Sequence, residues 1–201
     1  MTINTIQDCF GTILHGEKEE SRQAARKVKK ILYSSSVEDK EKYNDIRKVI
    51  ESAPNKYFKI SDDWRRENFV VAISVIYFLH DKEEEPDFLF PWFFQLLQHS
   101  NGVIRYAAVR MITFELGPLS AHIRISDYKS EKLKPKQADD ILYALFIGLN
   151  ELLNMLWELK FKKYKYINSL PASPYKSVQM VLASMEEYCG QKHIDYWSKS
   201  Y

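Results

Sequence analysis

The amino-acid sequence predicts an almost entirely α-helical protein built from about four stacked antiparallel helix pairs. Glycine and proline are scarce, with 6 and 7 residues in 201, whereas all-β folds need many turn residues. Apolar residues recur at spacings of three and four, which is the period of an amphipathic helix. A third observation is a repeat of about 40 residues, a period typical of two-helix units.

Composition places the chain among ordinary globular proteins, because 45% of its residues are hydrophobic and 28% are charged. The net charge of +2 is far below the cationic excess of most dedicated nucleic-acid binders. We find no basic start followed by an apolar stretch, and no apolar segment long enough to span a bilayer. We therefore expect a single cytoplasmic domain over residues 1–201 with no membrane association.

The first predicted pair covers approximately residues 2–34. Apolar residues from Ile3 to Leu14 follow a helical stripe that stops at Gly16. The acidic stretch that starts at Glu17 then opens a second helix, because acids in a first turn complement the helix dipole.

The second pair covers approximately residues 37–80. Pro54 closes its first helix, and Ser61 is the predicted N-cap of its second. Residues 69–79 are apolar on nearly every side, as in a helix buried between two neighbours. A strand is the competing interpretation because valine and isoleucine are dense here. The length of the segment, with no turn signal, favours the helix.

The third pair covers approximately residues 86–117, with a tight connection at residues 100–102. Its second helix is predicted to stop at Gly117 and Pro118, since glycine and proline commonly follow helix ends. Residues 118–135 form a polar insertion, which we interpret as a long loop with a short helix. Unstructured loops of this length are unusual in compact domains unless they are functional.

The fourth pair covers approximately residues 136–189 and carries the longest apolar stripe. The stripe comprises Ile141, Leu145, Leu149, Leu152, Leu153, Leu156 and Leu159. Gly190 is predicted to end the last helix. The tail, residues 191–201, is expected to be loosely held.

A basic residue followed by an apolar face recurs in the second helix of each pair. The four positions are Arg22, Arg66, Arg105 and Lys176. The apolar face begins two or three positions after each of them. Because a two-helix unit cannot bury both of its faces alone, the sequence predicts that neighbouring pairs stack.

Residues 91–116 resemble a HEAT-type repeat. A leucine-rich helix ends there in a short turn with asparagine, and Val103, Arg105 and Ala108 match a Val-x-Arg-x-x-Ala helix. Residues 21–28 resemble the second helix of another copy. The resemblance to HEAT or armadillo-type helical repeats implies a right-handed α-solenoid, a superhelix whose second helices line a concave surface. Such surfaces commonly bind proteins and sometimes nucleic acid.

Basic residues along the second helices are the candidate partner-binding site. They are Arg22, Arg26, Arg65, Arg66, Arg105, Arg110 and Lys176. On a concave face they would bind an acidic protein or peptide partner. Alternatively, each pairs with an acid of the neighbouring repeat and spaces the stack, because exposed charges are usually solvated or weakly paired. We expect a non-catalytic binding or scaffold protein.

Nucleic acid is the alternative partner. Some helical-repeat proteins resemble alkylpurine DNA glycosylases, and four residues could mimic the constellation of such enzymes: Asp62, Trp64, Arg65 and Arg66. Residues 160–166 interleave four lysines with three aromatic residues, a mixture that can bind phosphates and bases, although cations also suit a helix C-terminus. The near-neutral net charge argues against a DNA groove. A homodimer that buries the third pair is a further alternative.

No catalytic, cofactor-binding or metal-binding residue is predicted. The five histidines show no i, i+4 pair and no His-Glu-x-x-His motif. The nucleophile and phosphate-loop motifs Gly-x-Ser-x-Gly and Gly-x-x-x-x-Gly-Lys are missing from the sequence, and the two cysteines form no Cys-x-x-Cys motif. Asp139 and Asp140 are interpreted as first-turn acids of a helix. The aromatic residues Trp92, Phe93, Phe94 and Trp157 are interpreted as inter-helix packing.

Overall fold

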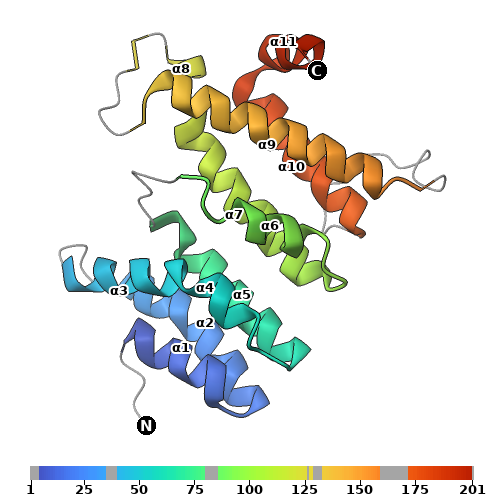
Figure 1. Ribbon diagram of the computed structural model, residues 1–201. Coiled ribbons are helices and arrows are strands. Elements are labelled where there is room, and N and C mark those ends of the chain that lie inside the picture. The colour runs from blue at the N-terminus through green and yellow to red at the C-terminus, as the bar shows by residue number, and fades with distance from the viewer. Residues whose placement is uncertain are drawn as a thin grey trace. The chain divides into compact units, whose positions relative to one another are not determined.

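The computed structural model describes most of the chain. The described residues are 5–34, 40–79, 86–125, 127–128, 133–158 and 172–200. Within these ranges every regular element is a helix and none is a strand (Figure 1), so the predicted all-α class is confirmed. The chain divides into two compact units, Met1–Lys82 and Glu83–Tyr201, and each is described by itself.

Unit 1 contains five α-helices and one 3₁₀-helix within its described residues. They are α1 (Ile6–His15), α2 (Lys18–Ser34), α3 (Lys40–Glu51), α4 (Ala53–Tyr57), α5 (Asp63–Ile76) and η1 (Tyr77–Leu79). A capping box begins α1, in which Thr5 and Asp8 each accept a hydrogen bond from the other's backbone N–H. Helix α2 packs against both α1 and α5. Helix α5 and the 3₁₀-helix η1 together cover residues 69–79, so the helical interpretation of this segment is correct.

Two helix ends in unit 1 differ from the sequence prediction. Ser61 is not the N-cap of α5, because Asp62 occupies that position. The Asp62 carboxylate makes no capping bond and instead accepts a hydrogen bond from Arg65 Nε at 3.2 Å. Pro54 follows α3 as predicted, but it also lies in the first turn of α4. Proline is favoured there because the first helical N–H has no partner within the helix.

Unit 2 contains a second set of packed helices. They are α6 (Phe90–Leu97), α7 (Gly102–Leu119), α8 (Ala121–Arg124), α9 (Pro135–Met155), α10 (Pro174–Cys189) and α11 (Gln191–Ser200). Helix α7 packs against α6 and α10, and α10 also packs against α9 and α11 (Figure 1). The short helix predicted within residues 118–135 is α8. Nowhere in the described chain is a helix both long and apolar enough to cross a bilayer.

The predicted end of the second helix at Gly117 and Pro118 is wrong. Helix α7 continues to Leu119, with Pro118 inside its last turn. Proline removes only one helical N–H donor at this position. Ser120 compensates at the end of the helix, because its backbone N–H and its hydroxyl both donate to the Leu116 carbonyl. A proline this close to a helix end is therefore tolerated.

The predicted apolar stripe of α9 is only partly buried. The buried residues of α9 are Ala138, Leu142, Leu145, Leu149 and Leu152. Ile141, Leu153 and Leu156 of the predicted stripe are half-buried, and Leu159 lies outside the described residues. The core-facing side of α9 is thus rotated relative to the predicted stripe, which leaves Ile141 at a surface.

The prediction of a loosely held tail is also wrong for its described residues, 191–200. Gly190 ends α10 with a φ of +80°, a conformation that favours glycine, and α11 follows at once. Trp197 of α11 is only 1% exposed. Its ring lies 5.6 Å from that of Phe146 in α9 and 4.6 Å from that of His193, measured between ring centres. The tail therefore contributes an anchor to the core of unit 2.

Candidate functional site

The predicted basic residues occupy different environments. Arg22, Arg26 and Arg110 are exposed, Arg65 and Arg66 are half-buried, and Arg105 and Lys176 are buried. Burial lowers the pKa values of Arg105 and Lys176 because it removes water from their cations. These side chains therefore do not present one uniform cationic surface.

Three of the arginines bind backbone carbonyl groups between helices. Arg105 Nη1 donates to the carbonyls of His99 and Ser100, at 2.6 and 2.7 Å. Arg65 Nη1 donates to the Ile13 and Gly16 carbonyls at the end of α1. Arg66 Nε donates to the Ile60 carbonyl before α5, at 2.8 Å. The last carbonyls of a helix have no partner within it, so a guanidinium is a suitable donor for them. Arg65 thus joins α5 to the end of α1, whereas Arg66 and Arg105 bond the segments that precede their own helices.

Arg22, Arg65 and Arg66 make ion pairs that are local in sequence. Arg22 pairs with Glu19, Arg65 with Asp62 and Arg66 with Asp63, each three residues away on its own helix or helix cap. Among the described residues, none of these arginines pairs with an acid of a neighbouring helix pair. For Arg22, Arg65 and Arg66, the acid partner is therefore on the same helix or its cap.

The constellation compared with DNA glycosylases is brought together at the start of α5. The Arg65 guanidinium carbon lies 4.4 Å from the centre of the Trp64 ring. The same side chain bonds Asp62 and two carbonyls of α1, Ile13 and Gly16. The guanidinium of Arg65 thus makes its hydrogen bonds and its ring contact within the protein itself.

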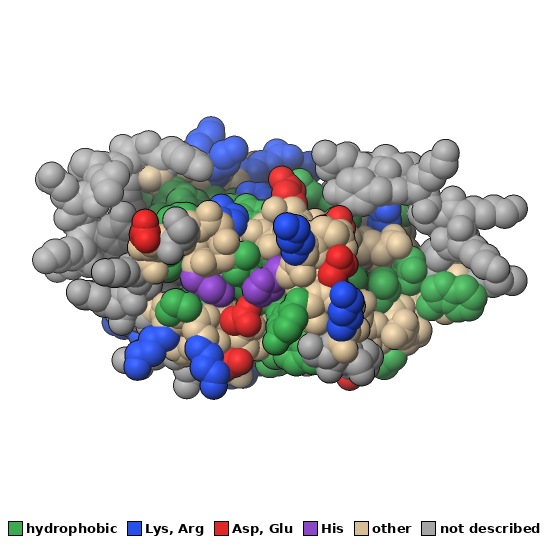
Figure 2. Space-filling model, turned by 90° about the horizontal axis from the view of Figure 1, so that it is seen from above, with side chains coloured by type: hydrophobic (Ala, Val, Ile, Leu, Met, Phe, Trp, Pro, Cys, Tyr) green, Lys and Arg blue, Asp and Glu red, His purple; other side chains and the backbone are tan. Residues whose placement is uncertain are grey.

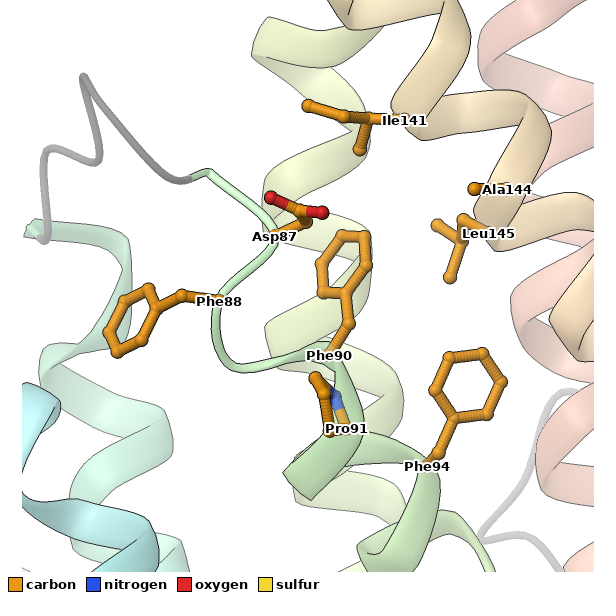
Figure 3. Close-up of a pocket in the computed structure, with 8 residues that line it drawn as sticks. All are labelled: Asp87, Phe88, Phe90, Pro91, Phe94, Ile141, Ala144 and Leu145. Atoms are coloured by element: carbon orange, nitrogen blue, oxygen red, sulfur yellow. The ribbon is translucent and has the colours of Figure 1, made fainter.

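An apolar groove of about 460 Å³ lies between the start of α6 and the middle of α9 (Figure 3). Its lining residues are Asp87, Phe88, Phe90, Pro91, Phe94, Ile141, Ala144 and Leu145. Asp87 is the only polar side chain among them. The volume and the apolar lining are typical of ligand-binding clefts. Neither the groove nor its lining was predicted from the sequence.

Local sequence explains how the groove is built. Pro91 lies in the first turn of α6, and the rings of Phe90 and Phe94 extend from that helix toward α9 (Figure 3). Ile141 and Leu145 are four residues apart, so both side chains lie on the same face of α9. The backbones of α7 and α10 approach closely, whereas those of α6 and α9 do not. Side chains therefore fill the space between α6 and α9 only in part.

Gly148 leaves room on α9 for the ring of Phe94. A Cβ atom at Gly148 would stand 3.1 Å from Cζ of Phe94, closer than an ordinary van der Waals contact. With Ala144 one turn earlier, α9 presents two small residues toward α6. This pair of small residues within a leucine-rich stripe was the one sequence signal for the groove.

One end of the groove is charged. A second hollow of about 530 Å³ shares Asp87, Ile141 and Ala144 with the groove. It adds the side chains of Lys134, Lys136, Gln137 and Asp140. The apolar groove thus continues into a rim with two cations and two carboxylates.

The predicted aromatic cluster is divided between core and surface. Trp92 and Phe93 are buried, as predicted. Phe94 is half-buried and lines the groove, and Trp157 is half exposed. The basic and aromatic stretch at residues 160–166 lies outside the described residues.

Two histidines and an aspartate meet on another face of unit 2. His193 Nε2 of α11 lies 2.7 Å from Asp139 Oδ1 of α9, and His122 Nε2 of α8 lies 3.9 Å from the same oxygen. Figure 2 shows histidine side chains gathered beside an acidic one. In the part of the chain that the structure describes, no three His, Cys, Asp or Glu side chains are placed to hold a metal ion. The His193 contact attaches α11 to α9.

Comparison with known proteins gave no match to a family model, a curated protein or a solved structure. The geometry of the groove is therefore the basis for a functional proposal.

Proposed function

We propose that this chain is a non-catalytic binding protein that holds a short apolar segment of a protein partner in the groove between α6 and α9. The observation that carries the proposal is the lining of the groove, in which Asp87 is the only polar side chain. Specific binding of a polar small molecule requires several convergent polar groups. An apolar side chain of a partner requires only shape and buried area, and it supplies about 25 cal/mol per Å² that it buries.

An amphipathic helix is the segment that fits best. Such helices place apolar residues at positions i, i+3 and i+4 into a groove between two helices. The rim residues Lys134, Lys136 and Asp140 are exposed and carry both signs of charge. They complement a segment whose apolar face is flanked by charges of both signs. Rim charges of this kind mainly set the association rate and the orientation of the partner.

The packing of second helices supports a HEAT-like solenoid within each unit. Helix α2 contacts α5, and α7 contacts α10, as stacked repeats require. The groove lies instead between two first helices. The proposal therefore moves the binding site away from the predicted concave face, because Arg65, Arg66 and Arg105 are bonded to carbonyls. Arg22, Arg26 and Arg110 remain exposed for secondary contacts.

Selection of helical peptides from a random phage library on the intact protein tests the proposal. Ala144→Glu places a charge in the groove at an exposed position, so the fold should tolerate it while peptide binding falls at least about tenfold, or 1.4 kcal/mol. Asn154→Glu adds the same charge to the same helix at an exposed position outside the groove, and binding should persist. If no selected peptide distinguishes Ala144→Glu from Asn154→Glu, the groove is not the binding site.

A further inference from the structure

Unit 1 contains a pocket of its own, with a volume of about 500 Å³. It lies where the end of α1, the segment after α4 and the start of α5 meet. Leu14 and Ile60 provide its apolar surface, and Ile60 is buried. The other lining side chains are polar, and most are basic. The volume lies within the range of small-molecule sites.

The pocket has an excess of positive charge. Lys56, Lys59 and Arg65 line it together with His15, against the single carboxylate of Asp62. In the described chain, no hydrogen bond or ion pair engages the amines of Lys56 and Lys59 or the ring of His15. Two lysines without an ion pair of their own thus line the same pocket, of which Lys56 is half-buried and Lys59 is exposed. Such groups repel each other unless an anion neutralises them.

Arg65 neutralises the Asp62 carboxylate and the carbonyl groups at the end of α1, which would otherwise repel an anion. Its side chain is 16% exposed and bonds the Asp62 carboxylate through Nε at 3.2 Å. Its Nη1 donates to the carbonyls of Ile13 and Gly16, at 3.1 and 2.9 Å, which are the negative end of α1. The positive charges of Lys56 and Lys59 are therefore not neutralised by an acidic group of the pocket.

The start of α5 adds to this positive field. The helix spans 14 residues, and its N-cap Asp62 makes no side-chain capping bond. The N–H groups of a first turn then carry the partial positive charge of the helix dipole without a side-chain acceptor. Asp62 and Ser61 line the pocket, so this helix end is at its edge.

We propose that this pocket binds the phosphate group of a small phosphate monoester. Lys56 and Lys59 neutralise the two negative charges of the phosphate, and charge-assisted hydrogen bonds of this kind are about twice as strong as neutral ones. Leu14 and Ile60 contact the apolar part of the ester. A monocarboxylate would leave one lysine uncompensated, so the dianion is the better match. This site is separate from the groove of unit 2 and does not depend on its function.

Titration of the intact chain followed by ¹⁵N NMR tests the proposal, with inorganic phosphate and phenyl phosphate as probes at constant ionic strength. Both should bind saturably at residues of the pocket, and phenyl phosphate should bind more tightly because its ring contacts the apolar surface. The double variant Lys56→Gln/Lys59→Gln should weaken both at least about tenfold, since a hydrogen bond to a charged group contributes about 1.5–3 kcal/mol.

The matched control is Lys29→Gln/Lys30→Gln, which removes the same charge from two exposed positions of α2 in the same unit. It should leave both affinities unchanged. Circular dichroism without phosphate should show that both double variants are folded. Loss of affinity in the control, no saturable shift at the pocket, or preferential binding of a DNA oligonucleotide over phenyl phosphate would overturn the proposal.

Discussion

Arg105 is 4% exposed, and its guanidinium donates to two carbonyl groups of the connection before α7. Arg105→Ala leaves those carbonyls without their donor, and we expect the free energy of unfolding to fall by about 3 kcal/mol. Arg105→Lys should recover only part of this loss, because an ammonium lacks the fork geometry of a guanidinium. Urea unfolding followed by circular dichroism measures both values.

Arg110→Ala is the matched control, on the same helix and exposed. Its effect should stay within about 0.5 kcal/mol, as for most surface substitutions. Equal losses for Arg105→Ala and Arg110→Ala would contradict a structural role of the Arg105 hydrogen bonds.

The thiol of Cys189 gives a pH-dependent prediction. Burial is the main cause that raises its pKa from 9.0 to about 11, and Asp139 adds to the shift. The folded state therefore keeps this proton at a pH where the unfolded state loses it. The resulting stability is complete below pH 9 and is lost as the pH rises toward 11, by about 2.7 kcal/mol for two pKa units.

Comparison of wild type with Cys189→Ala measures this contribution. The urea midpoint of the wild type should fall more steeply between pH 9 and 11 than that of Cys189→Ala, since only the wild type has this thiol. Cys9 remains in both proteins, and its own raised pKa contributes equally to each. Identical pH slopes would show that burial of Cys189 does not control its ionisation.

At the level of residues, the sequence located the repeated arginines but not their contacts. Arg65, Arg66 and Arg105 all donate to backbone carbonyls. Every residue has a backbone carbonyl group, so the sequence does not indicate which carbonyl accepts a hydrogen bond from an arginine. Acidic side chains, in contrast, can be identified from the sequence. Ion pairs with a neighbouring repeat were therefore the alternative to partner binding that the sequence suggested for these arginines.

Among the helices, α11 gives the clearest prediction because its two neighbouring aromatic residues differ in burial. Trp197 is 1% exposed and Tyr196 is 65% exposed. Trp197→Ala should lower the free energy of unfolding by about 3–5 kcal/mol, because it removes a large side chain from the core. Tyr196→Ala should change it by less than about 0.5 kcal/mol. Urea unfolding gives the two values.

Hydrogen exchange distinguishes local from global effects of Trp197→Ala. If α11 is docked through this side chain, the amides of α11 should lose protection first, while those of α7 keep theirs. Similar stabilities for Trp197→Ala and Tyr196→Ala would contradict the anchor.

Helices with a continuous apolar stripe were predictable, as α2, α5 and α9 show. Helix ends and the last helix were not. Helix α7 passes through Pro118 because Ser120 supplies the bonds at its end. Helix α11 is held by Asp139 and Phe146 of α9, which are distant in sequence. Contacts of this kind override the local signals that sequence patterns report.

For the whole molecule, the all-α class followed from the scarcity of glycine and proline and from the helical period. The groove could not be predicted in the same way, because it depends on the distance between α6 and α9. Helix α6 packs on α7, α7 packs on α10, and α10 packs on α9, so that distance follows from several helix contacts and not from a local sequence pattern. Two small residues, Ala144 and Gly148, indicate only that a neighbour can approach α9 closely, and they do not specify a groove.

The two compact units predict that stability is not uniform along the chain. Phe69 of α5 is fully buried in unit 1, with its ring 5.8 Å from that of Phe10. Phe69→Ala should cost about 3–5 kcal/mol, and in native-state hydrogen exchange the loss should concentrate in α1, α2 and α5. Leu149→Ala, at a fully buried position of unit 2, is the reciprocal variant and should affect α7, α9 and α10.

This pattern is expected because each compact unit has buried core residues of its own. A cavity in one core should lower the protection of the helices packed around it most strongly. Equal loss of protection in both units, for Phe69→Ala and for Leu149→Ala, would instead show that residues 1–201 unfold as the single cooperative domain that the sequence suggests.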